Sequence, residues 1–110
     1  MAYDERLAAR LRDLALGEPE VSEKAMFGGL AFLVRGHLAF CASSQGGVLL
    51  RVPPERTEEL LGEPHTDEFV MQRRAMRGWL RVEAEGVADD AALERWTTIA
   101  LDHVRSLPPK

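Results

Sequence analysis

The chain has 110 residues, of which 45% are hydrophobic and 29% charged, a composition typical of one globular domain. Its formal net charge of −4 argues against a general attraction of the whole surface to nucleic acid. The only cysteine, Cys41, excludes an internal disulfide, and no apolar run reaches the length of a membrane span. The N-terminal residues lack the pattern of a secretion signal. We therefore expect one domain over residues 1–110, located in the cytoplasm.

The first predicted elements are a helix and an edge strand. Residues 4–16 repeat leucine at helical spacing, with Asp4 as a suitable N-cap, and Gly17 and Pro19 end the segment. Residues 21–26 follow as a strand, and their mixed polar and apolar pattern is typical of a sheet edge.

Residues 30–34 form an unbroken apolar run that is too short for a helix buried on all sides. We interpret this run as the central strand of a sheet. Gly28 and Gly29 precede it and predict a turn or bulge, with a positive φ at Gly29 as the hypothesis. Both faces of the strand are apolar, and the helices of the chain would cover one face well and the other poorly. This imbalance predicts a homodimer.

Two further strands are predicted to complete an antiparallel meander. Arg35 and Gly36 form a tight turn, residues 37–42 and 48–52 have strand patterns, and residues 43–47 are turn formers.

The second half of the chain is less regular. Two prolines are expected to open a short helix over residues 55–61, whereas residues 65–75 are polar and show no clear pattern. Residues 78–82 alternate and are predicted to be the last strand.

A final helix is predicted to run to about Ser106, with Asp89 or Asp90 as its N-cap. The order is then helix, four strands, helix, strand and helix. Strands joined by hairpins, with helices grouped apart, predict an α+β domain. We expect an antiparallel sheet of about five strands with the helices packed mainly on one face.

Two short motifs lie near the first predicted hairpin and at the start of the last predicted strand. They are Met26-Phe27-Gly28-Gly29 and Met76-Arg77-Gly78-Trp79. Together with the helix order and the closing Ser106-Leu107-Pro108-Pro109-Lys110, they make the chain from Tyr3 to Lys110 resemble the N-terminal domain of the TfoX/Sxy family. These proteins are bacterial regulators linked to natural competence. The resemblance implies an α+β fold of the kind also seen in secretion chaperones.

The motif residues also need a physical interpretation, which is first of all structural. Glycines at these positions suit a turn or bulge, and a phosphate-binding loop is disfavoured because an apolar strand, not a helix, follows Gly29. Met and aromatic side chains there could form a soft patch for a partner, although such residues more often fill a core. The proposed structural motif comprises Met26, Phe27, Gly28, Gly29, Met76, Gly78 and Trp79.

No pattern in the sequence predicts catalysis, a cofactor or a metal site. Cys41 and the histidines His37, His65 and His103 lack the spacing of metal ligands, and Cys41 lies within an apolar strand as a small hydrophobe would. The many carboxylates lie mostly in predicted loops or on helix exteriors, without the apolar surroundings that general acid–base pairs need. We therefore expect a protein that is not an enzyme.

Four arginines form the basic cluster of the chain, namely Arg73, Arg74, Arg77 and Arg81. They are candidates for binding phosphates or an acidic partner, and the alternative is a solvated, irregular segment. Longer members of the family carry a second, helical domain thought to contact DNA. For this chain we expect weak or no direct binding to DNA.

The resemblance implies a small regulatory interaction domain that acts through protein partners of the transcription machinery. The alternative is a chaperone-like module that holds a peptide on an exposed sheet or in an apolar groove. An exposed apolar surface would favour either of these, whereas a deep pocket with shifted pKa values would favour an enzyme.

Overall fold

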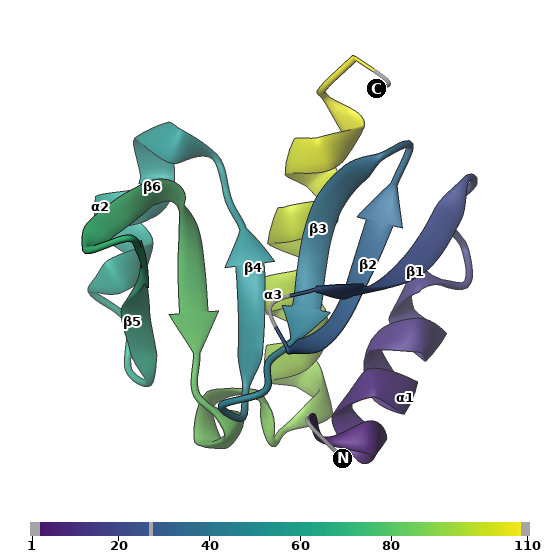
Figure 1. Cartoon of the computed structure of the whole chain (residues 1–110), viewed down its shortest axis with the longest axis horizontal. Coiled ribbons are helices and arrows are strands. Elements are labelled where there is room, and N and C mark those ends of the chain that lie inside the picture. Colours follow the sequence, from purple (N-terminus) through teal and green to yellow (C-terminus); the bar gives the residue numbers. More distant parts are fainter. Residues whose placement is uncertain (1–2, 27, 109–110) are drawn as a thin grey trace.

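The computed structural model describes residues 3–26 and 28–108. The strands in this part of the chain are β1 (Val21–Met26), β2 (Gly29–Val34), β3 (His37–Ala42), β4 (Val48–Arg51), β5 (Thr66–Met71) and β6 (Arg74–Val82). The helices are α1 (Glu5–Ala15), α2 (Thr57–Leu61) and α3 (Asp90–Arg105), with 3-10 turns η1 (Pro54–Arg56) and η2 (Ala84–Val87) before the second and third. The described strands form one antiparallel sheet in the order β1-β2-β3-β4-β6-β5 (Figure 1). The α+β class is confirmed.

Both long helices begin at an aspartate, as predicted. The Asp4 carboxylate accepts hydrogen bonds from the backbone N–H groups of Arg6 and Leu7, at 2.9 and 3.2 Å. The Asp89 carboxylate accepts one from the N–H of Ala91 at 2.8 Å. These bonds satisfy backbone N–H groups that have no partner within the helix. Of Asp89 and Asp90, the two predicted candidates, Asp89 is therefore the N-cap of α3.

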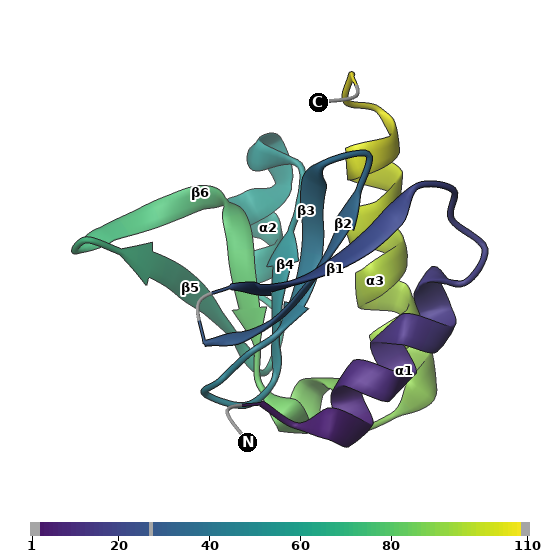
Figure 2. The same ribbon diagram turned by 45° about the vertical axis from the view of Figure 1, so that its right-hand side comes forward.

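The helices pack on one face of the sheet, as predicted (Figure 2). Leu11 of α1 and Leu93 of α3 are almost fully buried against Phe32 and Phe40, whose ring centroids lie 5.5 Å apart. Leu60 of α2 joins the same cluster. The burial of such apolar side chains is the main favourable contribution to the stability of a domain.

β2 lies inside the sheet between β1 and β3, which confirms that it is an internal strand, and β1 is an edge strand, as predicted. The centre of the sheet, however, is formed by β3 and β4, and every residue of β3 is buried. The turn between β2 and β3 has positive φ at Arg35 and Gly36, 53° and 85°, as a tight hairpin turn requires.

The predicted number of strands is wrong. Residues 66–71, which lie in the stretch without a clear pattern, form the edge strand β5, and β6 begins at Arg74 rather than at residue 78. β5 is at most half-buried along its whole length, so it lacks the apolar alternation of a strand packed on a core. The turn that joins β5 to β6 contains Gln72 and Arg73, and neither is a typical turn residue.

The hypothesis of a positive φ at Gly29 is also wrong. Gly28, which precedes β2, has the positive φ, of 75°. Gly29 is the first residue of β2. A Cβ at Gly29 would overlap with the backbone oxygen of Ala42 in β3. The position therefore needs glycine because of close strand approach, and Gly28 supplies the turn conformation.

None of the helices that the structure describes has the length and apolar character needed to cross a bilayer.

Candidate interaction surface

The opposite face of the sheet has its own apolar cluster, and no helix in the described part of the chain covers it (Figure 2). Its buried members are Ala31, Leu38, Cys41 and Leu49, and the half-buried side chains packed around them are Met26, Leu33, Phe69 and Trp79. We call these eight residues the helix-free face. The side chains packed around the centre of this face help to bury it, so the face is better covered than the sequence predicts.

The two sequence motifs meet at the helix-free face. Met26 of the first motif and Trp79 of the second pack against the same cluster, although they are far apart in the sequence. The Trp79 ring lies 6.5 Å from the ring of Phe69, between centroids, and the Arg51 guanidinium lies 5.3 Å from the Trp79 centroid. Phe27, which completes the first motif, lies outside the described residues.

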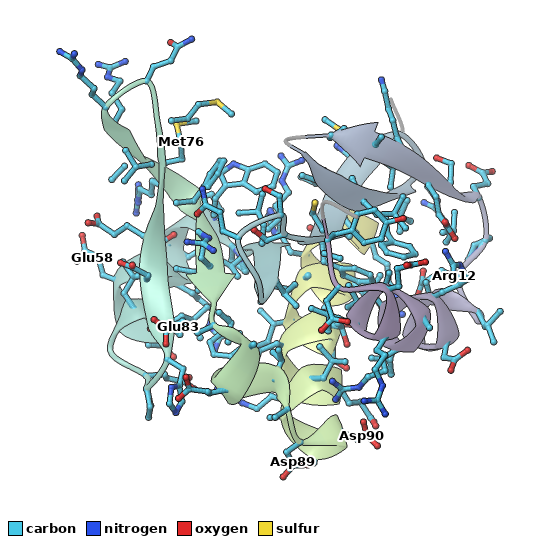
Figure 3. All side chains as sticks on the ribbon, turned by 60° about the horizontal axis from the view of Figure 1, so that its bottom comes forward. Arg12, Glu58, Met76, Glu83, Asp89 and Asp90 are labelled. Carbon is cyan, nitrogen blue, oxygen red and sulfur yellow. The ribbon has the colours of Figure 1, made fainter. Side chains whose placement is uncertain are left out.

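The motif glycines have structural roles in the described chain. Gly28 and Gly78 have φ values of 75° and 92°. The N–H of Gly78 donates to the Thr57 hydroxyl at 2.9 Å, and its carbonyl accepts from the N–H of Val52 at 2.9 Å. At Gly78, β6 parts from β4 and continues as a separate hairpin with β5, on which Met76 lies (Figure 3).

A hollow of about 240 Å³ opens at one end of the helix-free face. Its apolar lining comes from Cys41, Leu49, Phe69 and Val70, and its polar lining from Ser43, Ser44, Gln45, Glu68 and Arg81. The Arg81 guanidinium donates to the carbonyl oxygen of Gly46 at 3.3 Å and so belongs to this rim. An apolar floor with a few polar groups around it is typical of sites that bind a side chain or a small ligand.

Burial shifts two pKa values on this face. It raises the pKa of the Cys41 thiol to about 11 and lowers the pKa of the Arg51 guanidinium. The thiol is therefore protonated near neutral pH, and Cys41 acts as a buried hydrophobe, as predicted.

The described residues contain no group of three or more His, Cys, Asp and Glu side chains that could hold a metal ion. His37 is nearly buried, and its Nε2 donates to the carbonyl oxygen of Pro108 at 2.6 Å. His65 lies on the surface, and its Nδ1 is 3.8 Å from the carboxylate Oε2 of Glu83. Burial, and next the Arg51 charge, lower the pKa of His103 on α3.

The four arginines of the predicted basic cluster separate into two locations. Arg81 lines the hollow, whereas Arg73, Arg74 and Arg77 are exposed on the β5–β6 hairpin. Their role in partner binding stays a prediction.

Sequence reasoning missed the hollow, which is lined by the turn after β3 and by residues of β3, β4, β5 and β6. The loop Ser43–Gln45 was predicted only as a connection, and Phe69 lay in the stretch without a pattern. The available signal was the short apolar run of residues 69–71 within a polar segment, because such a run favours a strand.

The comparisons with known proteins agree with this architecture. The family model of the TfoX N-terminal domain matches residues 12–104, which is most of the chain. No curated protein matches the chain at a significant level. The matched range runs from α1 to the last turn of α3 and includes the whole sheet with both motifs. The chain therefore belongs to the TfoX N-terminal domain family.

Proposed function

We propose that this chain is a small, non-enzymatic regulatory domain that binds protein partners of the transcription machinery through its helix-free face. The observation that supports the proposal most directly is the hollow of about 240 Å³ beside the half-buried rim of that face. Half-buried Met and aromatic side chains around a recess are of the types that are enriched in protein interfaces.

The position of the family motifs gives further support. Met26 and Trp79 pack at the rim of this face. Trp79 directly follows Gly78, and a single residue separates Met26 from Gly28; both motif glycines have a positive φ. A motif that only maintained the core would be expected on the face covered by helices. Competence regulation, as in the named family, is the process in which we propose that the partner acts.

The test is affinity capture from native lysate with the tagged chain, compared with Leu33→Glu. Leu33 is half-buried at the rim, so a charge there should disrupt an apolar interface. The matched control is Leu16→Glu, because Leu16 is 76% exposed at the end of α1. We expect the parent chain and the control to retain a defined set of transcription proteins, identified by mass spectrometry, and Leu33→Glu to lose at least about nine-tenths of it.

Thermal unfolding of all three proteins shows whether each variant is folded. Equal capture by folded Leu33→Glu and by the parent would contradict the proposal. Capture of many unrelated unfolded chains, instead of a defined set, would favour the chaperone-like alternative.

A further inference from the structure

The β5–β6 hairpin projects from the body of the molecule (Figure 2). β4 pairs with β6 only over residues 79–82, so the preceding part of β6 has β5 as its strand partner. We call residues 70–77 the basic hairpin. Figure 3 shows nitrogen-bearing side chains gathered at its free end, beside Met76.

The charge of the basic hairpin differs from that of the remaining chain. The hairpin contains Arg73, Arg74 and Arg77 and no acidic residue. It thus contributes three positive charges to a chain whose formal net charge is −4, which leaves −7 on the rest.

Within the described part of the chain, these arginines lack the ion pairs that several other arginines make. Arg12, Arg95 and Arg105 each bind a carboxylate of the chain itself. Among the described residues, no carboxylate lies within salt-bridge distance of the three hairpin arginines, and all three are exposed. Their guanidinium groups are free to bind a carboxylate of another molecule in the bidentate geometry that arginine favours.

The turn at the tip has an unfavourable backbone conformation. Gln72 and Arg73 have φ values of 52° and 67°, a region in which residues other than glycine and asparagine are strained. Two-residue hairpin turns of this kind favour Asn-Gly, and the equivalent turn between β2 and β3 does place glycine second, as Gly36. An arginine in such a turn places a positive charge at the tip at a cost in stability.

Apolar side chains accompany the charges. Val70 is 55% exposed, and Met71 and Met76 are half-buried on the same hairpin. Flexible methionines beside cations suit a partner that offers both carboxylates and aliphatic groups.

We propose that the basic hairpin is the docking site for an acidic segment of a partner protein. Carboxylates of that segment would bind Arg73 and Arg74, and its apolar side chains would contact Val70 and Met76. The inference rests on the proposed function in one respect, namely that the partner is a protein.

The distribution of charge favours an acidic protein segment over DNA. Two or three arginines neutralise few phosphates, and the body of the chain, with a charge of −7, would repel a duplex of high charge density. Glu58 and Glu68 line a groove together with Arg77. Their negative charges reduce the attraction of Arg77 for an anion. Arg73 and Arg74 are therefore the arginines to test.

The experiment measures binding by fluorescence anisotropy at about 150 mM salt, the physiological range. The probe is a short labelled peptide that contains glutamate and leucine in a glycine–serine background. We expect Arg73→Ala/Arg74→Ala to weaken binding at least about tenfold. The matched control is Arg6→Ala/Arg35→Ala, which removes the same charge; Arg6 is exposed on α1, and Arg35, with φ 53°, lies in the other hairpin turn. We expect the control to change binding less than about twofold.

Three further measurements could overturn the proposal. In the first, a peptide with glutamine in place of glutamate binds as tightly as the glutamate peptide. In the second, a labelled DNA duplex binds more tightly than the peptide. In the third, the parent chain does not bind the peptide. If the parent chain still captures transcription proteins and Leu33→Glu does not, any of these outcomes removes the hairpin inference and leaves the function of the helix-free face intact.

Discussion

Gly29 faces the backbone oxygen of Ala42 so closely that any side chain at this position must displace β3. We expect Gly29→Val to reduce the free energy of unfolding by about 3 kcal/mol or more, because overpacking between strands cannot relax without loss of ladder hydrogen bonds. Urea denaturation measures the change. Gly17→Ala is the control, since a Cβ there meets no atom within 4 Å, and it should change the stability by less than about 0.5 kcal/mol.

Ionisation of the Cys41 thiol is expected to make the free energy of unfolding depend on pH in the alkaline range. Its pKa is raised from 9.0 to about 11 in the folded state because burial disfavours the thiolate. The native state therefore binds the proton more tightly than the unfolded state. The resulting stabilisation is complete below about pH 9 and is lost as the pH rises towards about 11.

The measurement compares the parent with Cys41→Ala between pH 8 and pH 11, a range set by these pKa values. We expect the parent to lose about 2 kcal/mol more than the variant over this range, since each unit of pKa shift corresponds to about 1.4 kcal/mol. Parallel pH curves for the two proteins would show that the thiol ionises as easily in the folded state as in the unfolded chain.

At the scale of elements, Thr57 links α2 to β6. Its hydroxyl donates to the Pro54 carbonyl at 2.8 Å and accepts from the buried N–H of Gly78 at 2.9 Å. Both bonds lie where β6 parts from β4, so this residue supports the base of the basic hairpin.

We expect Thr57→Val to destabilise the fold by about 2 kcal/mol, because a buried N–H and a carbonyl oxygen lose their partner. Thr57→Ser keeps the hydroxyl and should retain most of the stability. Thermal unfolding distinguishes the two variants, and an equal loss in both would assign the effect to the methyl group instead.

The strained turn of the basic hairpin predicts opposite effects on stability and binding. Gln72→Asn/Arg73→Gly should stabilise the protein by about 1 kcal/mol, since both residues then suit a positive φ. The same variant should weaken binding of the acidic peptide, because one arginine is lost. Arg35→Gly is the matched control at the other turn: we expect higher stability with unchanged binding. A double variant no more stable than the parent would show that the tip is unstrained.

At the scale of the whole molecule, the sheet separates two surfaces of different kinds. α1 and α3 cover one side, and the other side ends in the half-buried rim of the helix-free face (Figure 2). The salt bridge between Arg10 of α1 and Asp90 of α3, at 2.9 Å, is exposed and contributes little to stability. The layers are held together mainly by apolar contacts.

A homodimer stays a prediction of this surface. Two copies could pair through Leu33 and Trp79, and a stable contact would bury about 800 Å² on each partner. Sedimentation equilibrium should then show a dimer at high micromolar concentration that Leu33→Glu dissociates. A parent chain that remains monomeric in that range would leave the helix-free face to other partners.

Most elements followed from local signals in the sequence. The Asp4 cap, the leucine repeat of α1, the Arg35–Gly36 turn and the period of α3 each depend on neighbours within a few residues, and such signals predicted these elements well. The two motifs, together with the order of the elements and the closing residues 106–110, likewise predicted the family to which the chain belongs.

Tertiary structure alone decided the remaining features. β5 is a half-exposed edge strand, so its sequence has little apolar periodicity, and its place beside β6 depends on long-range pairing. The need for glycine at residue 29 comes from the Ala42 backbone across the ladder. The packing of Met26 and Trp79 against one cluster depends on strand order and twist, which no local pattern encodes. The same holds for the hollow near Phe69 and for the separation of Arg81 from the basic hairpin.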